Sequence, residues 1–177
     1  MRRIVKTLFL VCTALSILAC SISFNLTETP TPVEIPTTEP SAIPTITVYF
    51  TDQAKFNVGT EPYEVAVSRP LPAGVDPVRA VLDAFFAGPT ADETAQGLVL
   101  VSSGFTGVGE LSIENGIARL HMLGKCANNG AAYSVANLIH KNLEQFAQIT
   151  AIKIYDENGD NLDPDSNMSS MPYCLEP

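Results

Sequence analysis

The chain has 177 residues, of which 46% are hydrophobic and 16% charged, and its formal net charge is −9 at pH 7. This length and composition are typical of one globular domain. The acidic balance, with no basic stripe, argues against nucleic acid and anionic lipid headgroups as partners, because both repel a negatively charged surface. We therefore expect no nucleic-acid partner, and attachment to a membrane would need a lipid anchor.

Residues 1–19 have the pattern of a bacterial secretory signal. Basic residues precede an apolar run over residues 8–18, which is too short to cross a hydrocarbon layer of roughly 30 Å at 1.5 Å per residue. The run ends in Ala19-Cys20, which resembles a lipobox, the site at which the cysteine is diacylated and becomes the mature N-terminus. A cysteine that merely lies beside a signal-peptidase site is the alternative.

Lipidation of Cys20 would place the protein on the extracytoplasmic face of the cell membrane, because two acyl chains suffice for stable anchoring. Residues 20–44 would then form a stalk. Residues 25–45 contain five prolines and six threonines and show no apolar periodicity. Such a segment favours an extended polyproline conformation of about 3.1 Å per residue. A proline-rich ligand for a binding module is the weaker alternative.

Residues 45–177 have the composition of a folded domain. Residues 45–50 and 63–68 are β-branched and aromatic runs of strand length. Asp76 and Pro77 are an N-cap and first-turn pair, and the apolar residues that follow repeat with helical spacing. We expect this helix to end in a left-handed cap at Gly88, before Pro89.

The second half of this domain begins with a β-hairpin over residues 110–122, in which Asn115-Gly116 forms a type I′ turn. This turn predicts the cross-strand pairs Glu114–Ile117, Ile113–Ala118, Ser112–Arg119, Leu111–Leu120 and Glu110–His121. A helix is expected over residues 131–148 and a last strand over 150–159. The order strand, strand, helix, strand, strand, helix, strand predicts an α+β fold, with one mixed or antiparallel sheet of about five strands and both helices on one face.

The order of these motifs over residues 46–162 resembles the GerMN domain of sporulation and spore-germination proteins, which often occurs on bacterial lipoproteins. The hallmark is a helix that ends in paired large apolar residues, followed by Gly-Pro-Thr and a nearby Glu. In this chain the matching residues are Phe85, Phe86, Gly88, Pro89, Thr90 and Glu93. The resemblance implies a noncatalytic module that acts in envelope assembly, similar to ring-building domains, and it gives these residues a structural role.

The sequence offers little to a catalytic or metal-dependent function. His121 is expected on an exposed sheet face and His140 on the flank of a helix, and no nucleophile elbow or dinucleotide loop occurs. The acidic turn over residues 156–165 lacks EF-hand spacing, so a solvated turn is favoured over an irregular calcium site. We expect no catalytic residues, cofactor or metal, and a hydrolase is the least favoured alternative.

Two of the four cysteines remain once Cys12 leaves with the signal and Cys20 is lipidated. Cys126 and Cys174 would then form a disulfide in an oxidising compartment, and a zinc site is disfavoured because no CxxC spacing is present. The sequence as a whole predicts a stalked, lipid-anchored envelope protein that contacts protein or peptidoglycan-associated partners, with self-association left open. The alternative is an extracytoplasmic lipoprotein that binds a solute or calcium.

Overall fold

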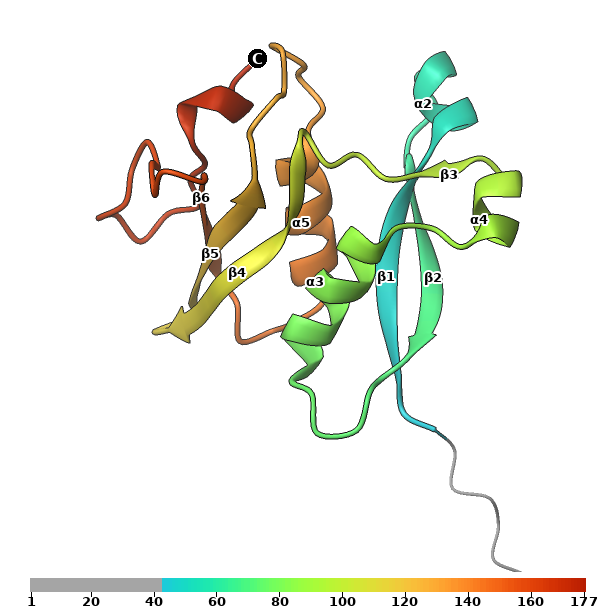
Figure 1. The fold of residues 1–177 in the computed structure, drawn as a ribbon, viewed down its shortest axis with the longest axis horizontal. Coiled ribbons are helices and arrows are strands. Elements are labelled where there is room, and N and C mark those ends of the chain that lie inside the picture. Colours follow the sequence, from blue (N-terminus) through green and yellow to red (C-terminus); the bar gives the residue numbers. More distant parts are fainter. Residues whose placement is uncertain (1–42) are drawn as a thin grey trace, which may run out of the picture. The chain divides into compact units, whose positions relative to one another are not determined.

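A computed structural model of the chain describes residues 43–177 (Figure 1). The predicted signal, Cys20 and most of the stalk lie outside the described residues. The elements in chain order are β1 (Thr45–Asp52), α2 (Gln53–Val58), β2 (Glu64–Pro70), α3 (Pro77–Ala87), α4 (Ala91–Ala95), β3 (Leu98–Val99), β4 (Phe105–Glu114), β5 (Ile117–Gly124), α5 (Val135–Leu143), β6 (Ala151–Tyr155) and a 3-10 helix (Tyr173–Leu175). The α+β class is confirmed, and the predicted order is kept with α2, α4, β3 and the 3-10 helix added.

The strands form two three-stranded sheets where one sheet of about five strands was expected. The first sheet has the order β2-β1-β3 and is antiparallel, and the second has the order β4-β5-β6, in which β5 and β6 run parallel. The short strand β3 pairs with β1 on the side opposite β2, where the expected single sheet would have continued. The β4–β5 hairpin belongs to the second sheet, and α3 and α5 lie between the two sheets (Figure 1).

One hydrophobic core joins the two sheets through the helices. Val48 and Phe50 come from β1, Phe85 from α3, Leu120 from β5 and Ile154 from β6, and all five side chains are fully buried. Burial of large apolar side chains is the main favourable contribution to folding. The two sheets and both long helices therefore depend on one another for stability.

Helix α3 begins as predicted and ends differently. The Asp76 carboxylate accepts hydrogen bonds from the backbone N–H groups of Val78 and Arg79, and Pro77 occupies the first turn. Gly88 has φ 81° and ψ 176°, so its backbone is not in the expected left-handed helical conformation. This combination of angles belongs to a region that is essentially restricted to glycine. The chain consequently leaves the helix in an extended direction toward Pro89.

Helix α5 is shorter than the predicted range 131–148. The Ser134 side chain accepts from the Ala136 N–H, and the Asn137 side chain accepts from the Ser134 N–H, which fixes the start of the helix. The helix ends at Leu143. Its buried face consists of Val135, Ala136, Leu138, Ile139, Asn142 and Leu143.

The hairpin has the predicted turn and most of the predicted register. Asn115 and Gly116 both have positive φ, and the four pairs nearest the turn are formed as expected. The predicted Glu110–His121 pair is absent, because an irregularity between Val108 and Leu111 shifts the register. Arg79 of α3 donates a hydrogen bond to the Gly109 carbonyl at 2.8 Å within this irregular stretch. The register predicted from the turn thus fails at the point where β4 is bonded to α3, a distant part of the chain.

Candidate functional site

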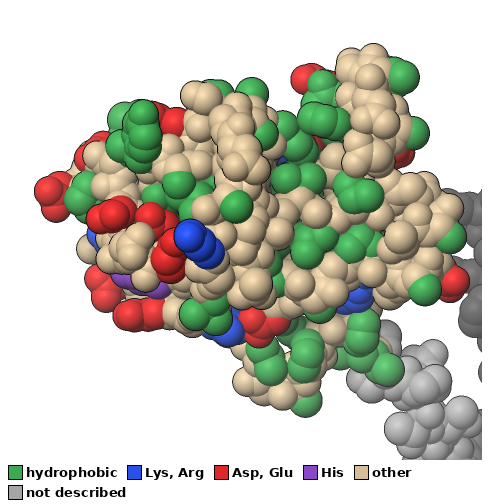
Figure 2. Space-filling view, turned by 45° about the horizontal axis from the view of Figure 1, so that its top comes forward, with side chains coloured by type: hydrophobic (Ala, Val, Ile, Leu, Met, Phe, Trp, Pro, Cys, Tyr) green, Lys and Arg blue, Asp and Glu red, His purple; other side chains and the backbone are tan. Residues whose placement is uncertain are grey.

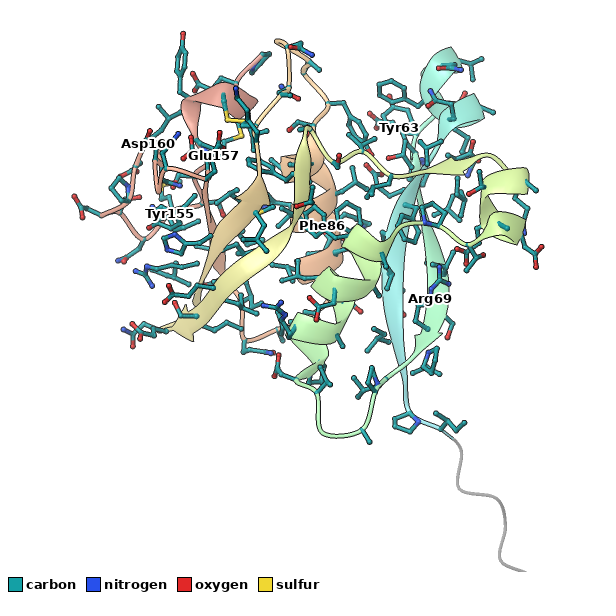
Figure 3. All side chains as sticks on the ribbon, viewed as in Figure 1. Tyr63, Arg69, Phe86, Tyr155, Glu157 and Asp160 are labelled. Carbon is teal, nitrogen blue, oxygen red and sulfur yellow. A yellow bond between two sulfur atoms is a disulfide. The ribbon has the colours of Figure 1, made fainter. Side chains whose placement is uncertain are left out.

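The paired phenylalanines of the motif lie at the end of α3. Phe85 is fully buried, and its ring stacks on the Phe50 ring with a centroid distance of 5.8 Å. The Phe86 ring meets the Phe85 ring edge-on at 5.0 Å and is partly buried (Figure 3). Aromatic pairs in these geometries stabilise a core beyond their area of burial. The two side chains therefore connect α3 to the first sheet.

The remaining motif residues start the next helix. Thr90 is the N-cap of α4, where its hydroxyl accepts from the Glu93 N–H at 3.3 Å and its own N–H donates to the Glu93 carboxylate at 2.9 Å. This reciprocal arrangement is a capping box. Gly88 and Pro89 supply the extended connection between α3 and α4.

Glu93 also forms an ion pair with Arg69 of β2. The two guanidinium nitrogens donate to the two carboxylate oxygens at 2.6 and 2.5 Å, and only 18% of the Arg69 side chain and 15% of the Glu93 side chain are exposed. The hydrogen bonds from Arg69 lower the pKa of Glu93 to about 2. The Arg69 guanidinium also lies over the Phe50 ring, 5.9 Å from its centroid. These contacts join β2, α4 and the buried aromatic pair.

Cys126 and Cys174 form a disulfide, with 6.3 Å between their Cα atoms. Cys126 follows β5, and Cys174 lies in the 3-10 helix near the end of the chain. Leu175, the next residue, is buried, and its carbonyl accepts from the Asn128 side-chain amide. The bridge thus holds the end of the chain beside the segment that leads into α5.

Three carboxylates of the acidic turn after β6 accept backbone hydrogen bonds, two of them within the loop and one, Glu157, from the Cys126 N–H at 3.2 Å. Asp156 accepts from the backbone N–H groups of Asn158 and Asp160, and Asp163 accepts from the N–H of Ser166. Within residues 43–177, no group of three or more His, Cys, Asp or Glu side chains gathers as a metal site. Figure 3 shows Glu157 and Asp160 in this region, beside β6.

The two histidines occupy different surroundings. The His121 ring stacks on the Tyr155 ring with a centroid distance of 4.5 Å, on the face of the second sheet that points away from the core. His140 lies on α5, where burial lowers its pKa although Glu144 acts in the opposite direction. His121 therefore has an aromatic neighbour on a sheet surface, whereas His140 borders the groove described next.

An open groove runs along the start of β2 and the outer side of α5. One part, of about 540 Å³, is bordered by Glu64, Ser134, Asn137, His140, Lys141 and Glu144 among others. A second part, of about 510 Å³, is bordered by Glu61, Pro62, Tyr63, Glu64, Tyr133 and Asn137. Because Glu64 and Asn137 border both parts, the two are neighbouring depressions on one surface.

Three aromatic rings adjoin the groove. Phe56 of α2, Tyr63 and Tyr133 have mutual centroid distances of 4.9 to 5.9 Å. The Tyr63 side chain lies between α2 and the loop that leads into α5 (Figure 3). Phe56 and Val58 are 38% and 75% exposed. In Figure 2, the α2 region projects at the upper right and hydrophobic side chains lie at its base.

Sequence reasoning missed this groove. Most of its residues lie in the loop before β2, at the start of β2, and on or just before α5, and no motif or periodicity connects them. The sequence signal for a binding site is weak, because Tyr63 and Glu64 stand out only as the first residues of a predicted strand. Only the pairing of β2 with β1 and the packing of α5 bring these residues together.

The groove is bordered by a serine, a histidine and a glutamate, as in many hydrolases, but they are not arranged as a catalytic triad. Ser134, His140 and Glu144 all border it. Ser134 is the buried N-cap of α5, and positions six residues apart do not share a helical face. No hydrogen bond between Ser134 and His140 is formed in the described part of the chain. A catalytic nucleophile needs a base within hydrogen-bond reach.

Solved structures of GerMN domains are similar to this chain, whereas no family model and no curated protein matches it. The tandem GerMN domains of the sporulation protein GerM from Bacillus subtilis are 18% identical, with a TM-score of 0.49 and coverage of 78% of this chain and 50% of that chain. The first GerMN domain of the same protein is 21% identical, with a TM-score of 0.46 and coverage of 73% and 92%. The chain thus spans half of the tandem structure, and it is similar to GerMN domains, the family that its motifs resemble.

No helix among residues 43–177 is both long enough and apolar enough to cross a membrane.

Proposed function

We propose that this protein is a noncatalytic, lipid-anchored module of the bacterial envelope that acts by contact with protein or peptidoglycan-associated partners. The motif resemblance to GerMN domains supports a role in envelope assembly related to sporulation or germination. In this proposal Cys20 carries the anchor, residues 20–44 form the stalk, and the folded domain lies at the extracytoplasmic face of the membrane. Self-association through the same module is a further option.

One observation carries this proposal: the motif residues are engaged in contacts inside the domain. Phe85 lies in the core, Thr90 caps α4, and Glu93 pairs with Arg69. Their side chains therefore serve as scaffold. The groove beside α5 is a concave surface that these motif residues do not line, and its open form suits a polypeptide segment better than an enclosed small solute.

A photo-crosslinking amino acid at Val58, which is exposed beside the groove, tests the contact function in native membranes. We expect a specific crosslinked species that mass spectrometry identifies as an envelope protein or as wall material. The matched control is the same amino acid at Leu162, which is exposed on the loop after β6. Identical crosslinked species from both positions would contradict a contact site at the groove.

The anchor is tested by Cys20→Ser. Because two acyl chains supply the membrane affinity in this proposal, we expect the variant to leave the membrane fraction, whereas the unsubstituted chain stays there after a high-salt wash. Metabolic labelling with a fatty acid gives the second readout. A Cys20→Ser chain that remained fully membrane-bound would contradict lipid anchoring.

A further inference from the structure

We infer that the groove beside α5 binds a lysine or arginine side chain on an extended segment of a partner protein. This inference rests on the proposed contact function and names the chemistry of the contact. The groove combines carboxylates with the half-buried rings of Tyr63 and Tyr133, and it is open to solvent along two neighbouring parts.

The charge of the groove favours a cation. Three carboxylates border it, those of Glu61, Glu64 and Glu144, against one ammonium group, that of Lys141. His140 also borders it, and burial lowers the pKa of this histidine and so disfavours its charged form. Lys141 already forms an ion pair with Glu144. The Lys141 charge also acts on Glu64, but neither Glu64 nor Glu61 forms an ion pair within residues 43–177. Negative charge is therefore in excess in the groove, and an incoming ammonium or guanidinium group can meet it. An anionic ligand would be repelled.

The Glu64 carboxylate is held in place by a short chain of hydrogen bonds. The Tyr133 hydroxyl donates to Glu64 Oε1 at 2.9 Å and lies 3.0 Å from the buried Thr51 hydroxyl. Burial raises the pKa of Tyr133, so its hydroxyl keeps the proton that it donates. Thr51 then donates to Tyr133, because the Tyr133 proton is already shared with Glu64. A carboxylate fixed in this way needs little ordering when a cation arrives.

Aromatic faces beside a carboxylate also favour a cation. A guanidinium or ammonium group within about 6 Å of an aromatic centroid is attracted by the ring quadrupole. The same chemistry occurs twice within the domain, where Lys141 lies 5.2 Å from the Tyr49 centroid and Arg69 lies 5.9 Å from the Phe50 centroid. Tyr63 borders the groove beside Glu61 and Glu64, so its ring is within reach of a cation that meets these carboxylates.

The dimensions favour an extended segment over a free amino acid. The two parts of the groove share Glu64 and Asn137 and have volumes of about 540 and 510 Å³. An isolated cationic solute would fill a small fraction of this space and remain largely hydrated. Several consecutive residues of an extended chain can cover both parts and place one basic side chain at Glu64.

The test uses the full-length protein in neutral detergent and a fluorescently labelled hexalysine peptide as the probe. We expect saturable binding by fluorescence anisotropy, with no binding of hexaglutamate or hexaserine. Glu64→Gln keeps an acceptor for the Tyr133 hydroxyl while it removes the charge, and it should weaken hexalysine binding about five- to tenfold. Tyr63→Leu should weaken it about threefold through loss of the aromatic face.

The matched control is Glu110→Gln, an exposed charge change on β4 that does not border this groove. It should alter the affinity for hexalysine by less than about 1.5-fold, because a surface charge outside the groove is largely screened. Equal weakening by Glu64→Gln and Glu110→Gln would mean diffuse attraction to an acidic protein and would overturn the inference. Equal binding of hexaserine would overturn it as well, since a contact without charge would then suffice.

The outcome is separable from that of the proposed function. If crosslinking at Val58 captures an envelope partner while hexalysine fails to bind, the cation-binding inference is wrong and the contact function stands. If hexalysine binds at Glu64 while no crosslinked species forms at Val58, the contact function fails at this surface. Thermal unfolding of every variant shows whether a loss of binding reflects loss of the fold.

Discussion

The two ends of strand β2 show two uses of a glutamate. Near one end, Glu93 of α4 meets the Arg69 guanidinium through two hydrogen bonds, above the Phe50 and Phe85 rings. At the other end, Glu64 receives a hydrogen bond from the uncharged Tyr133 hydroxyl and borders an open groove. A charge with its counter-charge inside the domain stabilises the fold, whereas a charge that faces a groove can select a partner.

Phe85→Ala should destabilise the protein more than any other change considered, at the end of β2 where Arg69 and Glu93 pair. Removal of a fully buried ring that stacks on Phe50 should lower the free energy of unfolding by about 3 to 5 kcal/mol. Urea denaturation followed by circular dichroism measures this change. Phe56→Ala, which truncates a ring that is 38% exposed, is the matched control and should cost much less. Equal losses for the two variants would contradict a scaffold role for Phe85.

Gly88→Ala tests the connection between α3 and α4 at the same end. The free energy of unfolding should fall by about 1 to 3 kcal/mol, because φ 81° with ψ 176° is unfavourable for any residue with a Cβ atom. Space is not the limiting factor, since the closest atom to a Cβ built there is Leu100 Cδ2 at 3.9 Å. Ala87→Gly, a small change next to it in a helical position, provides the comparison. An unchanged denaturation midpoint for Gly88→Ala would refute the backbone argument.

Glu93→Gln removes the charge that pairs with Arg69, and the cost at neutral pH should be about 1 to 3 kcal/mol. The pKa of Glu93 is about 2 in the folded protein, below its usual value of 4.5. The unfolded chain therefore takes up the proton first as the pH falls. The stabilisation is complete above about pH 4.5 and is lost as the pH falls toward 2.

Denaturation measured across this pH window separates the charge from the capping role of the side chain. The unsubstituted protein should lose stability more steeply with acid than Glu93→Gln does. Parallel curves for the two proteins would show that the ion pair contributes little to folding.

Glu64→Gln should have the smallest effect on folding, below about 0.5 kcal/mol, because the glutamine amide can still accept from Tyr133 and the lost charge has no internal counter-charge of the Arg69 kind. A thermal melt at neutral pH measures this value. A loss as large as that of Glu93→Gln would remove the distinction between the two ends of β2.

Local rules accounted for those parts of the fold that neighbouring residues determine. The Asp76-Pro77 start of α3, the Asn115-Gly116 turn and the pairs next to it follow from N-cap and hairpin preferences. The class and order of elements followed from these predictions. The disulfide followed from the cysteine count, once Cys12 and Cys20 were assigned elsewhere.

Contacts between distant segments determined the rest. The division into two sheets involves β3, whose two residues begin the short apolar run 98–101 and pair with β1. The groove depends on the start of β2 and on α5, which meet at Tyr133, the residue before the Ser134 N-cap. Neither arrangement can be predicted from local periodicity, because the residues that meet lie far apart in the sequence.

The place of β2 at the outside of its sheet also bears on the solubility of the folded chain. An unpaired strand edge is a template on which other copies can aggregate. This strand has seven residues and ends in Pro70, which has no backbone N–H to offer a new strand, and Arg69 points a charge toward the inner face. The Arg69–Glu93 pair thereby has a second effect. It holds a charged arginine on the edge strand β2, and such charges discourage edge-to-edge aggregation.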